Sequence, residues 1–237
     1  MYKEPAVKLF CIPYAGGLAS SYNSWRNYLR PDIELCPLEL SGRGRRFGEP
    51  LHTGVIEAAS DLLEQVKPEM NGLPFAVLGH SLGAILAYEL VRMIHNEMHS
   101  DPIHVFFSGR SPLHLTGWSK HHLLPDDEFL EYLVALGGIS HELQQHDDLL
   151  KLFLPIIRSD MQMVENYRLS VDNITPVQSN LSVLFGQEDT IDNLKQLEHW
   201  ALYSDADCRI EGFPGGHFFV TQNVSEVVAF INKTLQV

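Results

Sequence analysis

Three side chains have the types and the order along the chain that serine-based acyl transfer requires: Ser81, Asp189 and His217. A serine hydroxyl is a weak nucleophile at neutral pH, so it needs an adjacent base that takes its proton. Histidine supplies that base, and a carboxylate holds the imidazole in the tautomer that can accept the proton. We therefore predict that Ser81 is a nucleophile, His217 its general base and Asp189 the acid that orients the histidine.

Ser81 is the centre of the sequence Gly79-His80-Ser81-Leu82-Gly83. A bare G-x-S-x-G occurs often by chance, but here an apolar run over 75–78 precedes it and an apolar helical stretch over 84–94 follows it. A strand, a sharp turn with serine and a helix form the nucleophile elbow of α/β-hydrolases, in which the glycines allow two chain segments to pass closely. We expect His80 to have a structural role.

The acid and the base are expected in loops that follow late strands, in the order serine, acid, histidine. Asp189 follows the apolar strand 181–185, with Glu188 beside it and Asp192 as the expected cap of the next helix. His217 lies in the loop 213–219, 28 residues after Asp189 and beyond the last predicted strand. The nearby rival His199 falls in a predicted surface helix over 194–202.

An oxyanion hole needs two backbone amides directed at the developing negative charge. The amide of Leu82, directly after the nucleophile, is the first candidate. The loop Pro13-Tyr14-Ala15-Gly16-Gly17 follows the first predicted strand, and its glycines allow amides to face inward. We predict the amide of Ala15 as the second donor; a simple turn between strand and helix is the alternative.

Strands and helices alternate along the chain in a way that positions these loops at one sheet edge. Strands are predicted over 7–13, 33–38, 75–78, 103–108, 181–185 and 208–211, and helices over about 22–29, 55–68, 82–98 and 225–235. Strands separated by helices indicate a mostly parallel sheet covered on both faces. We predict one α/β domain over residues 1–237, with the α/β-hydrolase fold.

One interval is too long for a single crossover: 72 residues separate Ser108 from Leu181. A helix is predicted over 125–136, ended by Gly137-Gly138, and a second over 147–168, with Pro155 as a kink or break. We predict a helical lid over about 113–168, inserted after the sixth strand of the standard hydrolase sheet. An ordinary packed helical excursion is the alternative.

Composition limits the classes of partner and the compartment. The net charge of −13 argues against nucleic acid, and no apolar segment is long enough to span a bilayer. No secretory signal is visible, and the scattered Cys11, Cys36 and Cys208 suit free thiols in a reducing cytoplasm. There is no H-E-x-x-H or paired C-x-x-C motif, so we expect no metal. We also expect no cofactor and a monomeric enzyme.

Several longer motifs resemble type II thioesterases, the stand-alone editing enzymes of nonribosomal peptide and polyketide synthesis. The resemblance covers essentially the whole chain and is carried by the segments at 11–17, 40–46, 79–83, 123–129, 136–139 and 215–219. The Tyr-Ala-Gly-Gly, Gly-Arg-Gly-Arg-Arg and Pro-Asp-Asp-Glu-Phe sequences within them are more specific than the serine motif. Leu82 replaces the family's usual methionine and Ser41 its usual proline; neither change removes a predicted catalytic group.

The resemblance implies both a substrate and a biological role. The substrate would be an acyl or aminoacyl thioester on the phosphopantetheine arm of an acyl or peptidyl carrier protein. The role would be to remove acyl groups that are wrong or stalled. The residues alone imply only acyl transfer by serine. A medium-chain acyl-carrier-protein thioesterase and a small-molecule carboxylesterase remain alternatives within the same class. A catalytically silent hydrolase-fold binding module is an alternative of another class, against which the complete set of three residues argues.

A basic cluster, Arg43-Gly44-Arg45-Arg46, stands out in this acidic chain. Carrier proteins are commonly acidic and their arm carries a phosphate, so local positive charge could dock them. Pairing with acidic residues of the fold itself is the alternative, which we favour for at least one of the three arginines.

Overall fold

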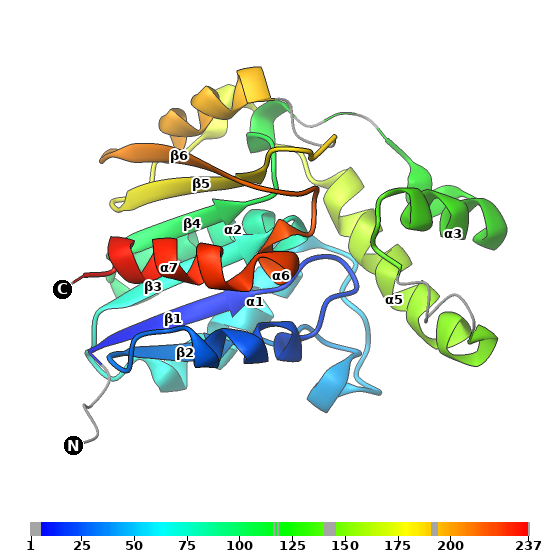
Figure 1. The fold of residues 1–237 in the computed structure, drawn as a ribbon, viewed down its shortest axis with the longest axis horizontal. Helices are drawn as coiled ribbons and strands as arrows, with labels where there is room; N and C mark the ends of the chain where they lie inside the picture. The colour runs from blue at the N-terminus through cyan, green and yellow to red at the C-terminus, as the bar shows by residue number, and fades with distance from the viewer. Residues whose placement is uncertain (1–5, 116, 118, 140–145, 191–193, 237) are drawn as a thin grey trace.

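The computed structural model describes residues 6–115, 117, 119–139, 146–190 and 194–236. Its centre is a six-stranded sheet in the order β2-β1-β3-β4-β5-β6, with every neighbouring pair parallel. The strands are β1 (Val7–Ile12), β2 (Ile33–Pro37), β3 (Phe75–His80), β4 (His104–Ser108), β5 (Asn180–Gly186) and β6 (Cys208–Phe213). The predicted α/β-hydrolase architecture is therefore confirmed (Figure 1).

Both faces of the sheet are covered by helices, which is why the central strands are apolar on both sides. In β4, Val105 and Phe107 pack into one core with α1 (Val55–Val66) and α2 (Leu82–Met98). Phe106, between them, points into a second core with α7 (Val224–Thr234). Figure 1 shows α7, α6 (Phe219–Gln222) and the 3₁₀ helix η1 (Ala19–Asn27) in front of the sheet and α1 and α2 behind it.

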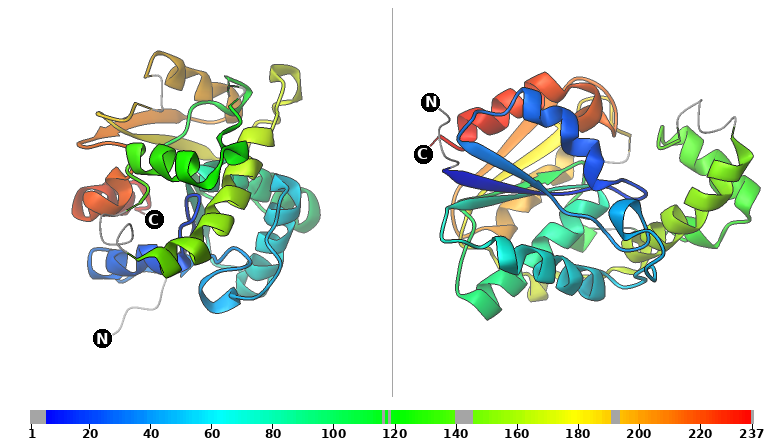
Figure 2. Two further views of the ribbon diagram at one scale, coloured as in Figure 1. Left: turned by 90° about the vertical axis from the view of Figure 1, so that its right-hand side faces the viewer. Right: turned by 90° about the horizontal axis from the view of Figure 1, so that it is seen from below.

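The long interval between β4 and β5 forms a separate layer. It contains α3 (Asp126–Ala135) and α5 (Asp147–Asn166), which lie beyond the carboxyl ends of the strands (Figures 1 and 2). The remaining described elements are 3₁₀ helices. Five of them are three residues long: η2 (Gly44–Arg46), η3 (Lys67–Glu69), η4 (Leu113–Leu115), η5 (His121–Leu123) and η6 (Val171–Asn173). The sixth, η7 (Leu194–Tyr203), is longer. None of the helices within the described ranges combines the length and apolar character needed to cross a bilayer.

Local structure departs from the predictions in a few places. The predicted helices at 22–29 and 194–202 are 3₁₀ helices, and strand β3 extends to His80 rather than ending at Leu78. Pro155 does not break α5, which continues through it. The helix α6 was not predicted, because four residues carry too little periodicity to indicate one.

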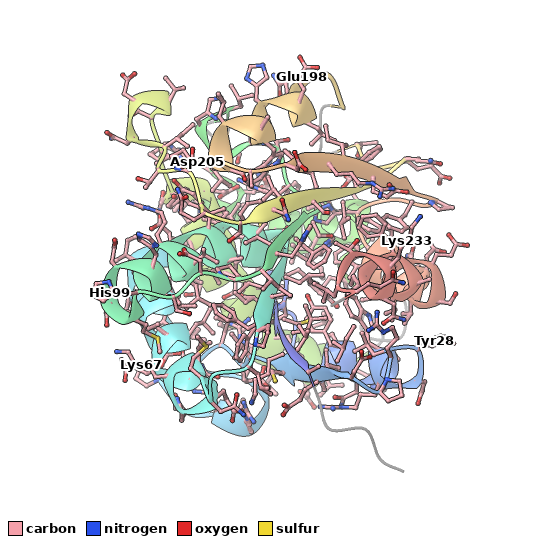
Figure 3. The ribbon with its side chains drawn as sticks, turned by 90° about the vertical axis from the view of Figure 1, so that its left-hand side faces the viewer. Tyr28, Lys67, His99, Glu198, Asp205 and Lys233 are labelled. Atoms are coloured by element: carbon pink, nitrogen blue, oxygen red, sulfur yellow. The ribbon has the colours of Figure 1, made fainter. Side chains whose placement is uncertain are left out.

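The opposite end of the molecule carries the connections that lead into the strands. Figure 3 looks at this end, away from α3 and α5. The polar residues labelled there stand around its rim, and none belongs to the predicted site: Tyr28, Lys67, His99, Glu198, Asp205 and Lys233.

Candidate active site

The turn between β3 and α2 holds Ser81 in a conformation that few side-chain-bearing residues adopt. Its backbone has φ 56° and ψ −111°, and such strain costs about 1–3 kcal/mol. Neither Gly79 nor Gly83 leaves room for a side chain. A Cβ on Gly79 would lie 1.9 Å from the carbonyl oxygen of Gly83, and a Cβ on Gly83 would lie 2.3 Å from the carbonyl oxygen of Ile12. The elbow is therefore packed directly against the end of β1.

His80 has the structural surroundings expected of it. The ring is fully buried, its Nδ1 is 2.8 Å from Ser108 Oγ, and its centroid is 5.1 Å from that of His217. Burial holds the pKa of His80 well below the ordinary value, so the ring is neutral at physiological pH. The amide of Ser81 also donates to the carbonyl of Ser108, at 2.8 Å, so two bonds join the elbow to β4.

Asp189 and His217 lie together as a hydrogen-bonded acid–base pair. His217 Nδ1 is 2.7 Å from Asp189 Oδ2, and the two side chains are only 8% and 1% exposed. A carboxylate accepts from Nδ1–H, which leaves Nε2 with a free lone pair for a proton. The pair therefore has the tautomer that a general base needs.

Backbone contacts explain why Asp189 rather than Glu188 reaches the histidine. The amide of Gln187 donates to the carbonyl of Phe213 at 2.8 Å, and that of Glu188 to Gly215 at 2.9 Å. A Cβ on Gly186 would lie 2.3 Å from the carbonyl oxygen of Gly216, so the two loops touch along their backbones. Glu188 is exposed, and Asp192, the expected cap of the next helix, lies outside the described residues.

Two amides are available for an oxyanion beside Ser81. No described residue accepts a hydrogen bond from the amide of Leu82 or of Ala15. Leu82 begins α2, whose N-terminal end carries partial positive charge. The next two amides in the first loop are occupied: that of Gly16 donates to Asp160 Oδ2 at 2.7 Å, and that of Gly17 donates to the carbonyl of Tyr14 at 2.8 Å.

A cavity of about 300 Å³ brings these groups to one surface. Ser81, Ala15 and His217 all line it. Apolar side chains from the insertion form one wall (Leu133, Leu136, Ile157, Met161 and Val164), and polar side chains also reach it (Arg110, Ser111, Ser119, Glu165 and Gln196). In this state no described residue accepts a hydrogen bond from the hydroxyl of Ser81, and contacts of this kind often tighten only with substrate.

The basic cluster divides into buried and exposed members, which corrects its interpretation as one docking surface. Arg43 is 2% exposed and forms a bidentate ion pair with Asp160. Arg46 pairs with Asp61 and Glu49. Only Arg45 is exposed and has no ion pair among the described residues.

One group of side chains outside the cavity lining could hold a cation, and a lysine already lies against it. Among the residues that the structure describes, the side chains of Glu34, Cys36 and Glu69 converge within 4.8 Å of one another. Lys8 Nζ lies 2.7 Å from Glu69 Oε2 and 3.5 Å from Glu34 Oε2, so its ammonium supplies the positive charge. All three cysteines are free thiols, as predicted.

Two acidic residues of α5 that line or support the cavity were not predicted. Glu165 is buried and accepts bonds from the amides and Nδ1 atoms of His121 and His122. Burial raises the pKa of Glu165, but these hydrogen bonds outweigh that effect and lower it to about 2. The available signal was position: Asp160 and Glu165 fall within the apolar helical pattern of Ile156, Ile157, Met161 and Val164.

Comparisons with known proteins find matches over nearly the whole chain. Residues 7–235 match the family model described as the thioesterase domain. The chain is 35% identical to the protein named linear gramicidin dehydrogenase LgrE of Brevibacillus parabrevis, over 100% of this chain and 90% of the relative.

Solved structures of proteins from biosynthetic pathways have a similar fold. The crystal structure of ClbQ from the colibactin NRPS/PKS pathway has a TM-score of 0.92 and 34% identity, covering 97% of this chain and 96% of that one. YbtT, a type II thioesterase from the yersiniabactin NRPS/PKS pathway, has a TM-score of 0.87 and 25% identity, covering 97% and 92%.

Proposed function

Because the chain belongs to the thioesterase domain family, we propose that it is a type II thioesterase that hydrolyses acyl or aminoacyl thioesters held on the phosphopantetheine arm of carrier proteins. Its role would be the removal of wrong or stalled acyl groups from a nonribosomal peptide or polyketide assembly line. ClbQ and YbtT come from pathways of this kind, which supports the assignment. We propose that it acts as a monomer in the cytoplasm.

The observation that carries this proposal is the shared cavity of Ser81, Ala15 and His217, with Asp189 bonded behind the histidine. In the proposed mechanism, His217 Nε2 takes the proton of Ser81 as Oγ attacks the thioester carbonyl. The amides of Leu82 and Ala15 stabilise the oxyanion of the tetrahedral intermediate. His217 then gives the proton to the leaving thiol, and an acyl-enzyme remains.

Hydrolysis of the acyl-enzyme uses the same groups in reverse. His217 Nε2 takes a proton from a water molecule, whose oxygen attacks the acyl carbonyl of the ester on Ser81. Collapse of this second intermediate returns the proton to Ser81 Oγ and releases the carboxylic acid. Asp189 stays ionised throughout and stabilises the imidazolium that forms in each half-reaction.

The insertion gives the cavity its shape, so we propose that it is a lid that selects the acyl group. The apolar wall formed by α3 and α5 suits an alkyl or aryl chain, and about 300 Å³ lies at the small end of ligand pockets. We therefore expect short or medium acyl groups to be preferred over long ones.

The decisive experiment measures hydrolysis of short, medium and long acyl groups, each attached to a carrier protein, to a small soluble thiol and, as an ester, to an alcohol. The proposal predicts the highest kcat/KM on the carrier protein, and labelling of wild type but not Ser81→Ala by a fluorophosphonate. Higher kcat/KM on the soluble ester would favour a carboxylesterase. A narrow preference for medium-length chains on the carrier of fatty acid synthesis would favour the medium-chain thioesterase, and no labelling would favour a silent binding module.

A further inference from the structure

The insertion and the sheet are joined by one buried ion pair, between Arg43 of the loop after β2 and Asp160 of α5. Their side chains are 3% and 1% exposed, and the guanidinium donates to both carboxylate oxygens of Asp160. Arg43 Nε also donates to the carbonyl of Ser41 at 3.3 Å. The guanidinium is planar and is itself held by Ser41, so it fixes the position of the Asp160 carboxylate and also balances its charge.

The same carboxylate holds the loop that contains Ala15. Gly16 N–H donates to Asp160 Oδ2 at 2.7 Å. Gly16 has φ +75°, and the amide of Gly17 donates to the carbonyl of Tyr14 at 2.8 Å, which together describe a type II turn over 14–17. In such a turn the peptide between the two central residues, here Ala15 and Gly16, is the unit that can flip. Asp160 fixes that peptide by its N–H.

A second contact from the same face of α5 restricts the turn. Ile157 lies one turn before Asp160, and a Cβ on Gly16 would lie 2.6 Å from its Cγ1. The side chain of Ile157 therefore covers the Cα of Gly16 while Asp160 binds its amide. Both contacts come from the insertion, although the turn belongs to the sheet.

Stability alone does not explain an ion pair in this place. Two charges lose hydration when they are buried, and apolar replacements of such pairs are often neutral or stabilising. The helix does not need the pair for attachment, because Met163 and Val164 on the same helix pack into the main core. What the pair supplies is a fixed acceptor for the amide of Gly16.

We propose that Asp160, held by Arg43, is a positioning residue for the oxyanion hole: it binds the Gly16 amide and so fixes the 14–17 turn, whose first peptide, Tyr14–Ala15, carries the Ala15 amide at the cavity. This inference rests on the proposed serine chemistry. It also gives the insertion a part in catalysis besides shaping the acyl pocket, because the residue that fixes the turn lies on α5.

The test is the double variant Arg43→Met/Asp160→Val, which removes both charges and keeps side chains that can pack. We expect kcat to fall roughly 10- to 100-fold, as for a displaced oxyanion donor, with KM within about twofold. The fall should be the same on a carrier-bound and a small soluble thioester. Affinity for an alkyl boronic acid, which forms a tetrahedral adduct on the serine, should fall by the same factor.

Asp160→Asn is the second variant, in case the double variant does not fold. Its amide oxygen can still accept from Gly16, but the charge is lost, so a smaller fall in kcat is expected. The matched control is Ser159→Ala, which removes the 2.8 Å bond from Ser159 Oγ on α5 to the carbonyl of His52 and leaves Gly16 untouched. We expect wild-type kcat from this control.

Unchanged kcat and boronate affinity in a folded double variant would overturn the proposal, and so would an equal loss of kcat in Ser159→Ala. A wild-type enzyme that hydrolyses nitrophenyl esters but no thioester would refute the proposed function alone. The role of Asp160 would then be tested by comparing kcat for ester hydrolysis between the wild type and the double variant. Inertness of the wild type to esters, thioesters and boronate would overturn both.

Discussion

The sheet and the insertion over 113–168 differ in what holds them together. Two large apolar cores enclose the sheet on its two faces. Among the described residues of the insertion, a small separate cluster of buried side chains consists of Phe129, Leu133, Ile139 and Ile157. Polar contacts also hold the insertion together. Glu165 binds His121 and His122. Arg158 donates to the carbonyls of His122 and Leu124, and its guanidinium carbon lies 4.2 Å from the ring centre of Phe129.

This difference affects how each region contributes to the proposed site. The sheet places Ser81, Asp189 and His217 through backbone contacts that leave no room for adjustment, as the clashes expected at Gly79, Gly83 and Gly186 indicate. The insertion supplies the apolar wall of the cavity from α5, which is anchored in the main core by Met163 and Val164, and from α3, which packs in the small cluster. An enzyme that edits varied acyl groups needs catalytic residues in fixed positions and a pocket wall that can adjust to each acyl group. The catalytic residues of the sheet meet the first need, and α3 is suited to the second.

The largest effect is expected in the sheet, from Ser81→Ala. Loss of the nucleophile should lower kcat for thioester hydrolysis roughly 10⁴-fold or more, while the melting temperature stays the same or rises. Alanine keeps the Cβ of serine, so the strain at φ 56° remains and cannot itself raise the melting temperature. Retention of a tenth of wild-type activity would show that Ser81 is not the nucleophile.

Asp189→Asn should be the next most damaging change. The amide can hold His217 in the wrong tautomer, so kcat should fall roughly 10³- to 10⁴-fold with little change in fold. Glu188→Gln is the matched control, because Glu188 is adjacent but exposed, and it should keep wild-type kcat. The reverse pattern of activities would assign the acid to Glu188.

Amide hydrogen exchange tests the contrast between the regions directly. We expect α3 to exchange roughly 10- to 100-fold faster than β3 and β4, since it belongs to the small cluster alone. Residues 160–166 of α5 should exchange slowly, because Met163 and Val164 pack into the main core. Protection of α3 equal to that of the central strands, with and without an acyl ligand, would contradict the lid.

Glu165→Gln should weaken the insertion in a pH-dependent way. The folded pKa of about 2 lies below the ordinary value of 4.5, so the carboxylate contributes stability that is complete above pH 4.5 and is lost as pH falls toward 2. We expect the variant to lose up to about 3 kcal/mol of unfolding free energy at pH 7. Urea titrations at pH 7 and pH 3.5 should show the difference shrinking in acid, and exposed Glu131→Gln should show neither effect.

The smallest effect is expected at the surface, from Arg45→Glu. If Arg45 helps to dock an acidic carrier protein, KM for acyl-carrier substrates should rise roughly three- to tenfold, while kcat/KM on a small soluble thioester stays unchanged. Lys233→Glu makes the same charge change at the opposite end of the molecule (Figure 3) and should leave both values unchanged. Equal effects on both substrates would show that Arg45 does not dock the carrier.

Local sequence was sufficient for the elements and for the order of the proposed catalytic residues. The apolar runs of the central strands, the G-x-S-x-G turn and the glycines of the 213–219 loop each act through a few neighbouring residues, so their patterns could be interpreted without the fold. Element ends were less certain: propensity could not distinguish the 3₁₀ turns at η1 and η7 from α-helix.

Contacts between distant residues had to wait for the tertiary structure. The sequence determined that Arg43 is part of a basic cluster, but it did not determine that Asp160, 117 residues away, buries it. It likewise placed glycines in the loop after β1 without indicating that α5 binds the amide of Gly16. Hydrophobic periodicity identifies which face of a helix turns inward, whereas the partner of a polar group on that face depends on how separate elements pack in space.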